Sequence, residues 1–406
     1  MPHSLKHPHK TRRGKLRRVL LLLGNYYQQN HLGIARFARE ARWSLDISHM
    51  RTGEVYQHAD RLDGIIGLIT HQRDLDTLRR LPKVPLVDIS AAWGTEALPD
   101  QGGRAVPRVL YDNAGIARLA AEHFIGRGFK HIAQLNLGNY YMERERRSVF
   151  RATIEGAGRV FHELEYYQWL QQAVLTATGS AEARAMKQLA GMLRKLPKPL
   201  AVFTSGDEIG VKVLLVCEEI GLGVPEEVAV LGCHNDPLIC EFAPVPLSSV
   251  DDNLELQGYE AARLLEQLMD HGPAPDSPVI IPAEGVVTRA STDILAVPHR
   301  EVARALHFIW QNFTTSIQVD DVANAAGLSR FHLMRLFHTH LGRSINDEIT
   351  RKRVDRAKEL LLQTNLKAWQ IAEQCGFSGI VHLSTTFSRI VGQAPSRFRE
   401  SHPRDE

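Results

Sequence analysis

Hydrophobic periodicity divides this sequence into two regions. From about Arg17 to about Pro282, short apolar runs alternate with amphipathic stretches of helical spacing, a pattern typical of strand-helix-strand units and a largely parallel sheet. After about Pro298 no strand pattern returns, and apolar residues recur only at helical spacing. We therefore predict an α/β domain followed by a separate all-α domain.

The predicted strands are mostly apolar throughout, as expected for strands that helices cover on both faces. They are the runs RVLLLLG, SLDISHM, LDGIIGLI, VPLVDIS, RVLYD, HIAQLNLG, PLAVFTSG and EVAVLGCHN. Amphipathic stretches between them predict helices, with Gly128 and Gly221 as stop signals. A Pro-rich passage, HGPAPDSPVIIP, precedes the change of pattern. We predict a basic disordered tail over 1–16, an α/β domain over 17–289, a linker over 290–300 and a helical domain over 301–400.

Composition indicates an ordinary soluble protein, with 44% hydrophobic and 23% charged residues among 406. The formal charge of +3 is small, so any affinity for nucleic acid must come from local clusters of Lys and Arg. The apolar run Val19–Leu23 is too short for the core of a signal peptide, and no segment is long enough to span a bilayer. The sequence therefore predicts a cytoplasmic protein that does not bind membranes.

Metal and cofactor sites are not predicted. The cysteines show no CxxC spacing and no pattern of histidine partners; they are Cys217, Cys233, Cys240 and Cys375. His338 and His340 lie near a predicted helix end but have no third ligand in the pattern. No phosphate-binding loop, GxSxG, HExxH or strand-linked GxGxxG motif is present, so an enzyme is not predicted.

The helical region contains an internal repeat. One amphipathic helix ends at Gly327, and a second begins at Ser329, a residue type that caps helix N-termini. About fifty residues later, Ala372, Gly376, Phe377 and Ser378 restate Ala323, Gly327, Leu328 and Ser329. Between the repeats, apolar residues at helical spacing predict a connecting helix; they are Ile345, Ile349, Val354, Ala357 and Leu361. The sequence therefore predicts two helix-turn-helix motifs, and two packed helix pairs without DNA contacts are the alternative.

The region from about Glu301 to Arg399 resembles the AraC type of DNA-binding domain. Its closing segment is similar to that family's terminal signature at Gly376, Phe377, Leu383, Phe387, Gly392, Pro395, Phe398 and Arg399. The resemblance implies that the second helix of each motif enters the major groove of operator DNA. It assigns DNA contacts to Ser329, Arg330, Phe331, Met334 and Arg335 in the first motif and to Ser378, Ile380, Val381, His382, Ser384 and Thr385 in the second. The family commonly has Arg in place of Thr385 and Ser in place of Val381, which implies weaker or methyl-directed reading by the second motif.

The region from Arg17 to Arg289 resembles the hinged sugar-binding domain of the LacI/GalR regulators and periplasmic binding proteins. The segments PLAVFTSGDEIG, EVAVLGCHNDP and YDNAGIARLAAEHFIGRG carry this likeness. The resemblance implies two α/β lobes that close over a ligand at the carboxyl ends of their strands. By the family's pattern, the ligand contacts are Asn25, Tyr26, Asp112, Arg146, Asp207, His234 and Asn235. The family usually has an acid in place of His234 and Asn in place of Gly206, so the ligand cannot be copied from relatives.

Each of these ligand assignments has a structural alternative. Asp112 and Asp207 can cap helices, Arg146 can be a solvated charge, and Tyr26 can pack in the interior.

A sugar-binding domain ahead of an AraC-type domain resembles the organisation of xylose operon regulators. We therefore predict a homodimeric regulator that binds operator DNA under the control of a monosaccharide, with RNA polymerase as a further partner. A regulator with a non-sugar effector, or with none, is the alternative.

Overall fold

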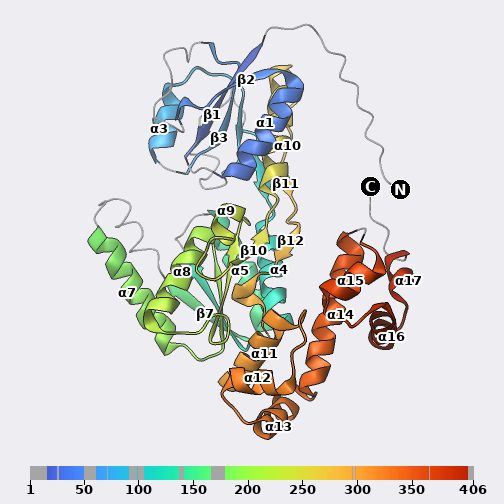
Figure 1. The fold of residues 1–406 in the computed structure, drawn as a ribbon. Coiled ribbons are helices and arrows are strands. Elements are labelled where there is room, and N and C mark those ends of the chain that lie inside the picture. Colours follow the sequence, from blue (N-terminus) through green and yellow to red (C-terminus); the bar gives the residue numbers. More distant parts are fainter. Residues whose placement is uncertain are drawn as a thin grey trace.

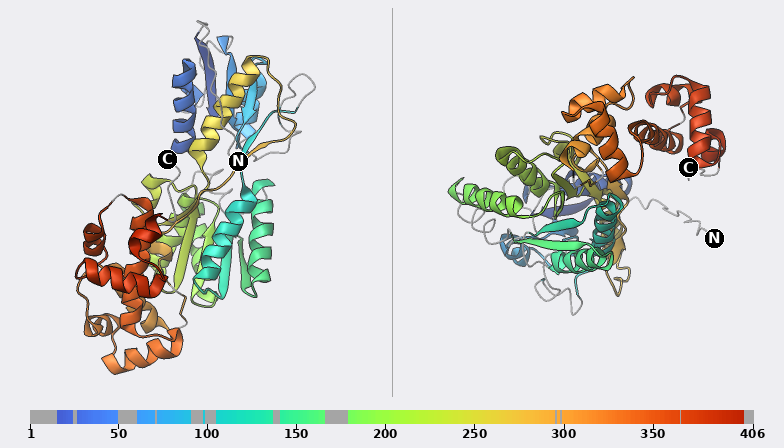
Figure 2. Two further views of the ribbon diagram at one scale, coloured as in Figure 1. Left: turned by 90° about the vertical axis from the view of Figure 1, so that its right-hand side faces the viewer. Right: turned by 90° about the horizontal axis from the view of Figure 1, so that it is seen from below.

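The computed structural model describes residues 16–24, 27–49, 61–70, 72–90, 98, 105–136, 141–165, 179–294, 296–297, 299–364 and 366–400. Figure 1 shows two α/β lobes, one above the other, with a helical domain beside the lower lobe. The same arrangement is seen from the side and from below in Figure 2. The parallel sheets and the helical domain confirm the predicted fold class.

The upper lobe, lobe 1, is built on a parallel sheet of order β2-β1-β3-β4. The strands are β1 (Arg17–Leu23), β2 (Trp43–Asp46), β3 (Gly64–Leu68) and β4 (Leu86–Asp88). Helices α1 (Gln28–Ala41) and α10 (Leu254–Met269) pack on one face of this sheet, and α3 (Gln72–Arg80) packs on the other. Strands β5 (Val109–Tyr111) and β11 (Val279–Ile281) pair in parallel beside it. Both faces are therefore covered, which explains why these strands are apolar throughout.

The lower lobe, lobe 2, has the sheet order β12-β10-β9-β8-β6-β7. Its strands are β6 (His131–Asn136), β7 (Val160–Glu165), β8 (Leu200–Thr204), β9 (Val228–Cys233), β10 (Ser248–Asp251) and β12 (Gly285–Val287), and β12 runs antiparallel to β10. Helices α4 (Asn113–Gly126) and α5 (Tyr141–Gly156) cover one face. The other face is covered by α7 (Gly179–Lys195) and α8 (Asp207–Ile220). The short helices α9 (Pro237–Cys240) and η3 (Ala290–Thr292) complete this lobe.

The chain passes between the lobes after Tyr111, after Asp251 and after Ile281. Strands β7, β10, β11 and β12 were not among the predicted strands. They are polar, lie at a sheet edge or contain only three residues, and such segments give little periodic signal. Ser291 and Thr292, at the start of the predicted linker, are fully buried, and the Ser291 hydroxyl donates to the Val230 carbonyl at 2.6 Å. These residues therefore pack as part of lobe 2.

The helical domain contains α11 (Arg300–Asn312), α12 (Val319–Ala326), α13 (Arg330–Leu341), α14 (Ile345–Gln363), α15 (Ala368–Gln374), α16 (Ile380–Val391) and α17 (Pro395–Glu400). Two separate cores form around the pairs α12/α13 and α15/α16. The long helix α14 joins them: Ile345 and Ile349 lie in the first core, and Val354, Ala357 and Leu361 lie in the second. Among the described residues, no helix is long and apolar enough to cross a membrane.

A left-handed glycine forms each turn between paired helices. Gly327 has φ 71° and Gly376 has φ 72°. This conformation costs an L-residue roughly 1 to 2 kcal/mol, so the sequence needs glycine at both positions.

The two turn glycines differ in their surroundings, which gives a matched prediction. Replacing Gly327 with alanine is expected to lower the free energy of unfolding by about 1 kcal/mol, the cost of the left-handed backbone alone, because the new Cβ would meet nothing within 4 Å. Replacing Gly376 is expected to cost more, because its Cβ would lie 2.6 Å from the Phe313 carbonyl oxygen and 2.7 Å from that of Thr314. Chemical unfolding of the two full-length variants measures the difference. Equal losses would show that the Gly376 turn does not pack against the end of α11.

Candidate ligand site and DNA-binding helices

Side chains of both lobes meet where β5, β9 and β10 end. Tyr27, which precedes α1 of lobe 1, places its ring centroid 4.8 Å from that of His234, which follows β9 of lobe 2. Tyr111 ends β5, and its ring lies 6.2 Å from the same imidazole. The Arg146 guanidinium lies 5.6 Å from the Tyr111 ring centroid. This cluster joins aromatic faces to charged groups, a combination suited to binding a polyhydroxylated ring.

Arg146 lies on α5 and is only 2% exposed. Its Nε and Nη2 atoms donate to Asn113 Oδ1 at 3.2 and 3.1 Å, and Nη1 donates to the Ser205 carbonyl at 3.1 Å. The alternative of a solvated charge is therefore wrong. A guanidinium carries five N–H groups, so this geometry leaves donors for a ligand.

His234 and Asp252 form a buried pair. Nδ1 of His234 lies 2.8 Å from Asp252 Oδ2, and the two residues are 9% and 0% exposed. Burial lowers the pKa of His234, but the charge and hydrogen bond of Asp252, together with Asp207, outweigh this effect and raise the pKa above its ordinary value. The imidazole therefore gains a proton more readily than an isolated histidine does.

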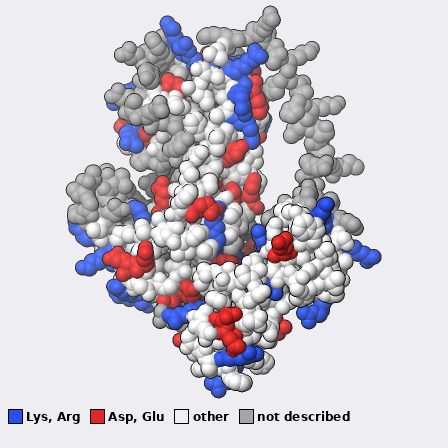
Figure 3. Space-filling model, viewed as in Figure 1, with Lys and Arg blue, Asp and Glu red and all other residues white. Residues whose placement is uncertain are grey.

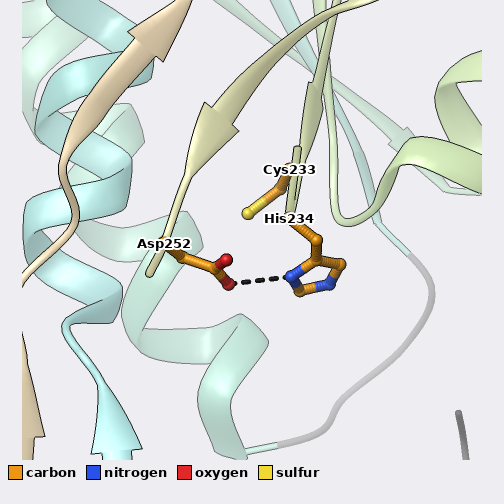
Figure 4. A group of neighbouring side chains, drawn as sticks. All are labelled: Cys233, His234 and Asp252. Atoms are coloured by element: carbon orange, nitrogen blue, oxygen red, sulfur yellow. Dashed lines mark hydrogen bonds and ion pairs between the residues drawn. The ribbon is translucent and has the colours of Figure 1, made fainter. Parts of the chain in front are cut away.

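Cys233 lies beside this pair, as Figure 4 shows. One possible ligand atom each from Cys233, His234 and Asp252 lies within 4.8 Å of the others, a spacing that a metal ion could bridge. Burial raises the pKa of the Cys233 thiol, however, and His234 Nδ1 is already hydrogen-bonded to Asp252. Metal binding needs a deprotonated thiol, and an ion at Nδ1 would displace the hydrogen bond to Asp252, so the arrangement favours a hydrogen-bonded imidazole-carboxylate pair.

Asp207 holds the loop that carries His234. Its Oδ1 accepts from the Ser249 hydroxyl at 2.6 Å, and its Oδ2 accepts from the Asp236 backbone N–H at 2.8 Å. Burial raises the pKa of Asp207 to about 6, although His234, Ser249 and Asp236 act in the opposite direction. Gly206, not Asp207, is the N-cap of α8, so the capping alternative is wrong for Asp207.

Asn235 continues this loop with φ 50° and is committed to internal hydrogen bonds. Its side chain donates to Asp251 Oδ2 at 2.9 Å and accepts from Arg289 Nη2 at 3.0 Å. Its carbonyl accepts from Gln29 Nε2 of lobe 1 at 3.0 Å, a hydrogen bond that joins the lobes. A cavity of about 400 Å³ lies at this junction and is lined by Gln29, His234, Asp251, Asn253 and their neighbours.

The structure brings Arg146, Asp207, His234 and Asn235 together in lobe 2. Asp112 lies at the N-terminus of α4 and caps it, accepting from the Gly115 N–H at 2.8 Å. Asn25 and Tyr26 lie outside the described residues. Sequence reasoning missed Tyr27, Tyr111, Asn113 and Asp252. Tyr27, Tyr111 and Asn113 lie at or near predicted strand ends, where the sequence offers no means of choosing among adjacent polar residues, and Asp252 follows a strand that was not predicted.

The first recognition helix, α13, begins at Ser329, whose hydroxyl accepts from the His332 N–H. Leu333 and Phe337 are fully buried, whereas Phe331 is 84% exposed. Met334 and Arg335 are also exposed, and Arg330 pairs with Asp320 at 3.1 Å. The residues assigned to DNA contact therefore share the solvent-facing side of this helix.

The second recognition helix, α16, presents the corresponding side: Val381 is 78% exposed, and Ile380, His382 and Thr385 are exposed as well. Ser384 is half-buried. The N-cap is Gly379, not Ser378, so the equivalence of Ser378 with Ser329 is wrong. The turn of the second motif has one more residue than that of the first, so residues after the turn correspond one position later. The Ser378 hydroxyl instead lies 3.1 Å from His382 Nδ1.

Helix α11 is shared between lobe 2 and the helical domain. Ala303 is buried in the lobe 2 core, whereas Val302, Ala305, Leu306 and Ile309 are buried in the first helix-turn-helix core. Residues from both parts therefore pack on one helix.

A polar contact lies beside α11. The ammonium of Lys352, on α14, lies 2.8 and 3.0 Å from the Asp293 carboxylate oxygens and 4.1 Å from the Trp310 ring centroid. Trp310 in turn donates to Glu348 Oε1 at 2.9 Å. Lys352 thus joins lobe 2 directly to the helix that connects the two motifs.

Basic side chains project from the rim of the helical domain on the face drawn in Figure 3. The exposed arginines of the helical domain include Arg330, Arg335, Arg351, Arg356, Arg389 and Arg397. These exposed arginines give the helical domain positive charge that can bind DNA phosphates, although Arg330 and Arg351 also pair with Asp320 and Asp355.

Comparison with known proteins gives a consistent result for both parts. A periplasmic binding protein-like domain matches residues 121–292, and a helix-turn-helix domain matches residues 322–401. The chain is 26% identical over 389 residues to the xylose operon regulatory protein of Escherichia coli K12, covering 95% of this chain and 93% of the relative. The corresponding protein of Haemophilus influenzae is also 26% identical, with 94% of each chain covered. A solved structure of the xylose-binding transcription activator XylR has a TM-score of 0.65 at 24% identity, covering 96% of this chain and 99% of that one.

Proposed function

We propose that this chain is a transcription regulator that joins a periplasmic-binding-protein-like domain to an AraC-type helix-turn-helix domain, and that it controls a carbohydrate operon in response to a xylose-like monosaccharide. The observation that carries the proposal is the buried cluster of Tyr27, Arg146 and His234 between the lobes, in one chain with two exposed recognition helices. In this account the protein acts in the cytoplasm as a homodimer without catalysing a reaction, and contact with RNA polymerase is a further expectation.

Sugar binding at this cluster favours the closed arrangement of the lobes. Aromatic faces pack on the ring, and the remaining N–H groups of Arg146 bind hydroxyl oxygens. Gln29 already donates across the junction to the Asn235 carbonyl, so a ligand that bridges the lobes adds to an existing contact. A ligand shifts the equilibrium only by its preference for the closed form, and a few kcal/mol is sufficient.

Helix α4 supplies the path from the sugar site to the helical domain. Asn113, its first residue, accepts two of the three hydrogen bonds that Arg146 donates. At the other end, His123 Nε2 lies 2.8 Å from the Thr292 hydroxyl, and Arg127 Nε donates to the Thr292 carbonyl at 2.9 Å. The helix is about 20 Å long and rigid. Asp293, the residue that follows Thr292, pairs with Lys352 of α14. A movement at Arg146 is thereby transmitted to the helix that spaces the two motifs.

The recognition helices α13 and α16 read successive major grooves in this proposal. Motifs that read one face of B-DNA lie about 34 to 36 Å apart, and a rigid α14 fixes the spacing within each chain. Arg330 and Arg335 supply charge and bidentate donors, whereas Ile380, Val381 and Thr385 suit thymine methyl groups.

Substituting Arg335 with alanine is expected to weaken specific DNA binding by about 1 to 3 kcal/mol, because an exposed arginine on α13 can pair bidentately with guanine. The measurement is fluorescence anisotropy with labelled DNA that the protein has selected from a random pool. Arg39→Ala, an exposed arginine on α1 of lobe 1, serves as the control and should bind as tightly as the parent protein. Unchanged affinity in Arg335→Ala would remove this residue from the DNA interface.

The sugar proposal is tested by thermal shift with pentoses, hexoses and their phosphates. A ligand at a hundred times its Kd adds about 2.7 kcal/mol of stability, which gives a measurable rise in melting temperature. A hit that is lost in Arg146→Ala supports the site. If no sugar stabilises the protein, the sugar proposal fails, and a regulator with a non-sugar effector or with none takes its place.

A further inference from the structure

Two departures from the sugar-binding family's pattern lie in contact. Gly206 stands where the family has Asn, and His234 stands where it has an acid. A Cβ at position 206 would lie 3.5 Å from Cδ2 and 3.6 Å from Nε2 of the His234 ring. A Cβ at this distance already touches the ring, so an Asn amide directed towards it would clash, and the glycine leaves that space open for the histidine. This chain has no carboxylate at position 234, but Asp252 places one 2.8 Å from Nδ1 of the His234 ring.

We infer that Gly206, His234 and Asp252 form one unit that reverses the hydrogen-bonding polarity of the effector site. His234 Nε2–H donates to an acceptor oxygen of the effector at a place where a carboxylate would accept from a hydroxyl. Asp252 is a positioning residue, which fixes the ring through Nδ1 without contacting the effector. This inference rests on the proposed function.

The free atoms of the pair support this assignment. The His234 side chain is 10% exposed, and among the described residues Nε2 has no hydrogen-bond partner. Asp252 Oδ1 is buried and likewise has no partner in the described part of the chain. The carboxylate therefore depends on His234 for its hydrogen bond, and the ring is oriented with Nε2 left for a ligand.

Several charged or titratable groups surround the ring. They are Asp252 after β10, Asp207 of α8, Arg146 of α5, Tyr27 before α1, Tyr111 of β5 and Cys233 of β9. Burial lowers the pKa of His234, the two carboxylates raise it, and the net effect is a pKa above the ordinary 6.5. Below this pKa, Nε2 carries a proton and donates. Above it, Nδ1–H stays with Asp252, and Nε2 becomes an acceptor. Affinity for an effector that presents an acceptor oxygen should therefore fall as the pH rises through this pKa.

The test is isothermal titration calorimetry of the full-length protein with D-xylose, between about pH 6 and about pH 9. The parent protein is expected to lose affinity by up to about tenfold as the pH rises, because a charge-assisted hydrogen bond from Nε2–H to a sugar oxygen gives way to a weaker one from a sugar hydroxyl to the neutral ring. In Asp252→Asn the amide oxygen still accepts from Nδ1, but the charge that raises the pKa is gone, so affinity should fall at a lower pH. Asp252→Ala should bind D-xylose at least about tenfold more weakly near pH 6, because the ring loses its orientation. Glu241→Gln, a surface partner of Arg289, is the control and should match the parent protein.

Two outcomes separate this inference from the proposed function. D-xylose binding that is independent of pH, with Asp252→Asn indistinguishable from the parent protein, would overturn the inference and leave the sugar proposal intact. Absence of binding by the parent protein to D-xylose and to the other sugars of the screen would overturn both. If Asp252→Ala misfolds, the pH profile of the parent protein and the Asp252→Asn variant still test the inference.

Discussion

Replacing Phe387 with alanine is expected to lower the free energy of unfolding of the second helix-turn-helix motif by about 3 to 5 kcal/mol. Phe387 is fully buried on α16, and its ring centroid lies 5.5 Å from that of Phe398. It packs in the core that holds Val354 and Leu383, so the shortened side chain leaves a cavity between α14 and α16. Chemical unfolding followed by circular dichroism and tryptophan fluorescence measures this loss.

Phe331→Ala is the matched control for this prediction. The residue type is the same and lies on the equivalent helix of the first motif, but it is 84% exposed. We expect its free energy of unfolding to stay within about 0.5 kcal/mol of the parent value. Equal losses in the two variants would contradict the placement of Phe387 in a core and of Phe331 on the solvent-facing side of its helix.

Replacing Lys352 with alanine is expected to abolish the effect of sugar on DNA binding while leaving sugar binding and DNA binding in place. The Lys352 ammonium joins Asp293 at 2.8 Å and the Trp310 ring at 4.1 Å, and these contacts link lobe 2 to α14. Coupling free energies between sites are typically 1 to 3 kcal/mol, so a change of roughly 5- to 150-fold in DNA affinity should disappear. DNA anisotropy with and without D-xylose measures the loss.

Lys358→Ala controls for the removal of a lysine from the same helix. Lys358 pairs with Asp355 within α14 at 3.3 Å, so its loss should leave the sugar response unchanged. A full sugar response in Lys352→Ala would show that the signal reaches the DNA-binding domain by another route.

The helical domain could be predicted closely because its signature residues determine the fold themselves. Gly376 and Gly392 adopt positive φ, and Leu383 and Phe387 are fully buried. Arg399 donates to the Leu366 carbonyl at 2.9 Å and to the Leu361 carbonyl at 3.2 Å, which stabilises the end of α14. The spacing of residues in the sequence is enough to predict local features of this kind. The additional residue before Gly379 was missed because a single insertion in a turn leaves the helical period unchanged.

The ligand site was predicted only in part because it is assembled from distant segments. Arg146 and His234 stand at positions that the family's pattern marks, although His234 departs from it in residue type, and their partners Asn113 and Asp252 are selected by the packing of α4, α5 and β10. Strand β10 was missed for a related reason. Ser248 and Ser249 make it look like a loop, yet both are fully buried, and their hydroxyls donate to the Arg289 carbonyl and to Asp207. Hydroxyl partners of this kind depend on the tertiary fold.

Sugar bound between the lobes is expected to change the affinity of the helical domain for DNA. The most direct measurement is the affinity of the full-length protein for its selected DNA with and without D-xylose, together with the affinity for D-xylose with and without that DNA. We expect each ligand to change the affinity for the other by the same factor, between about 5 and 150, because coupling between two sites is reciprocal. D-xylose that binds the protein and leaves its DNA affinity unchanged would contradict this expectation.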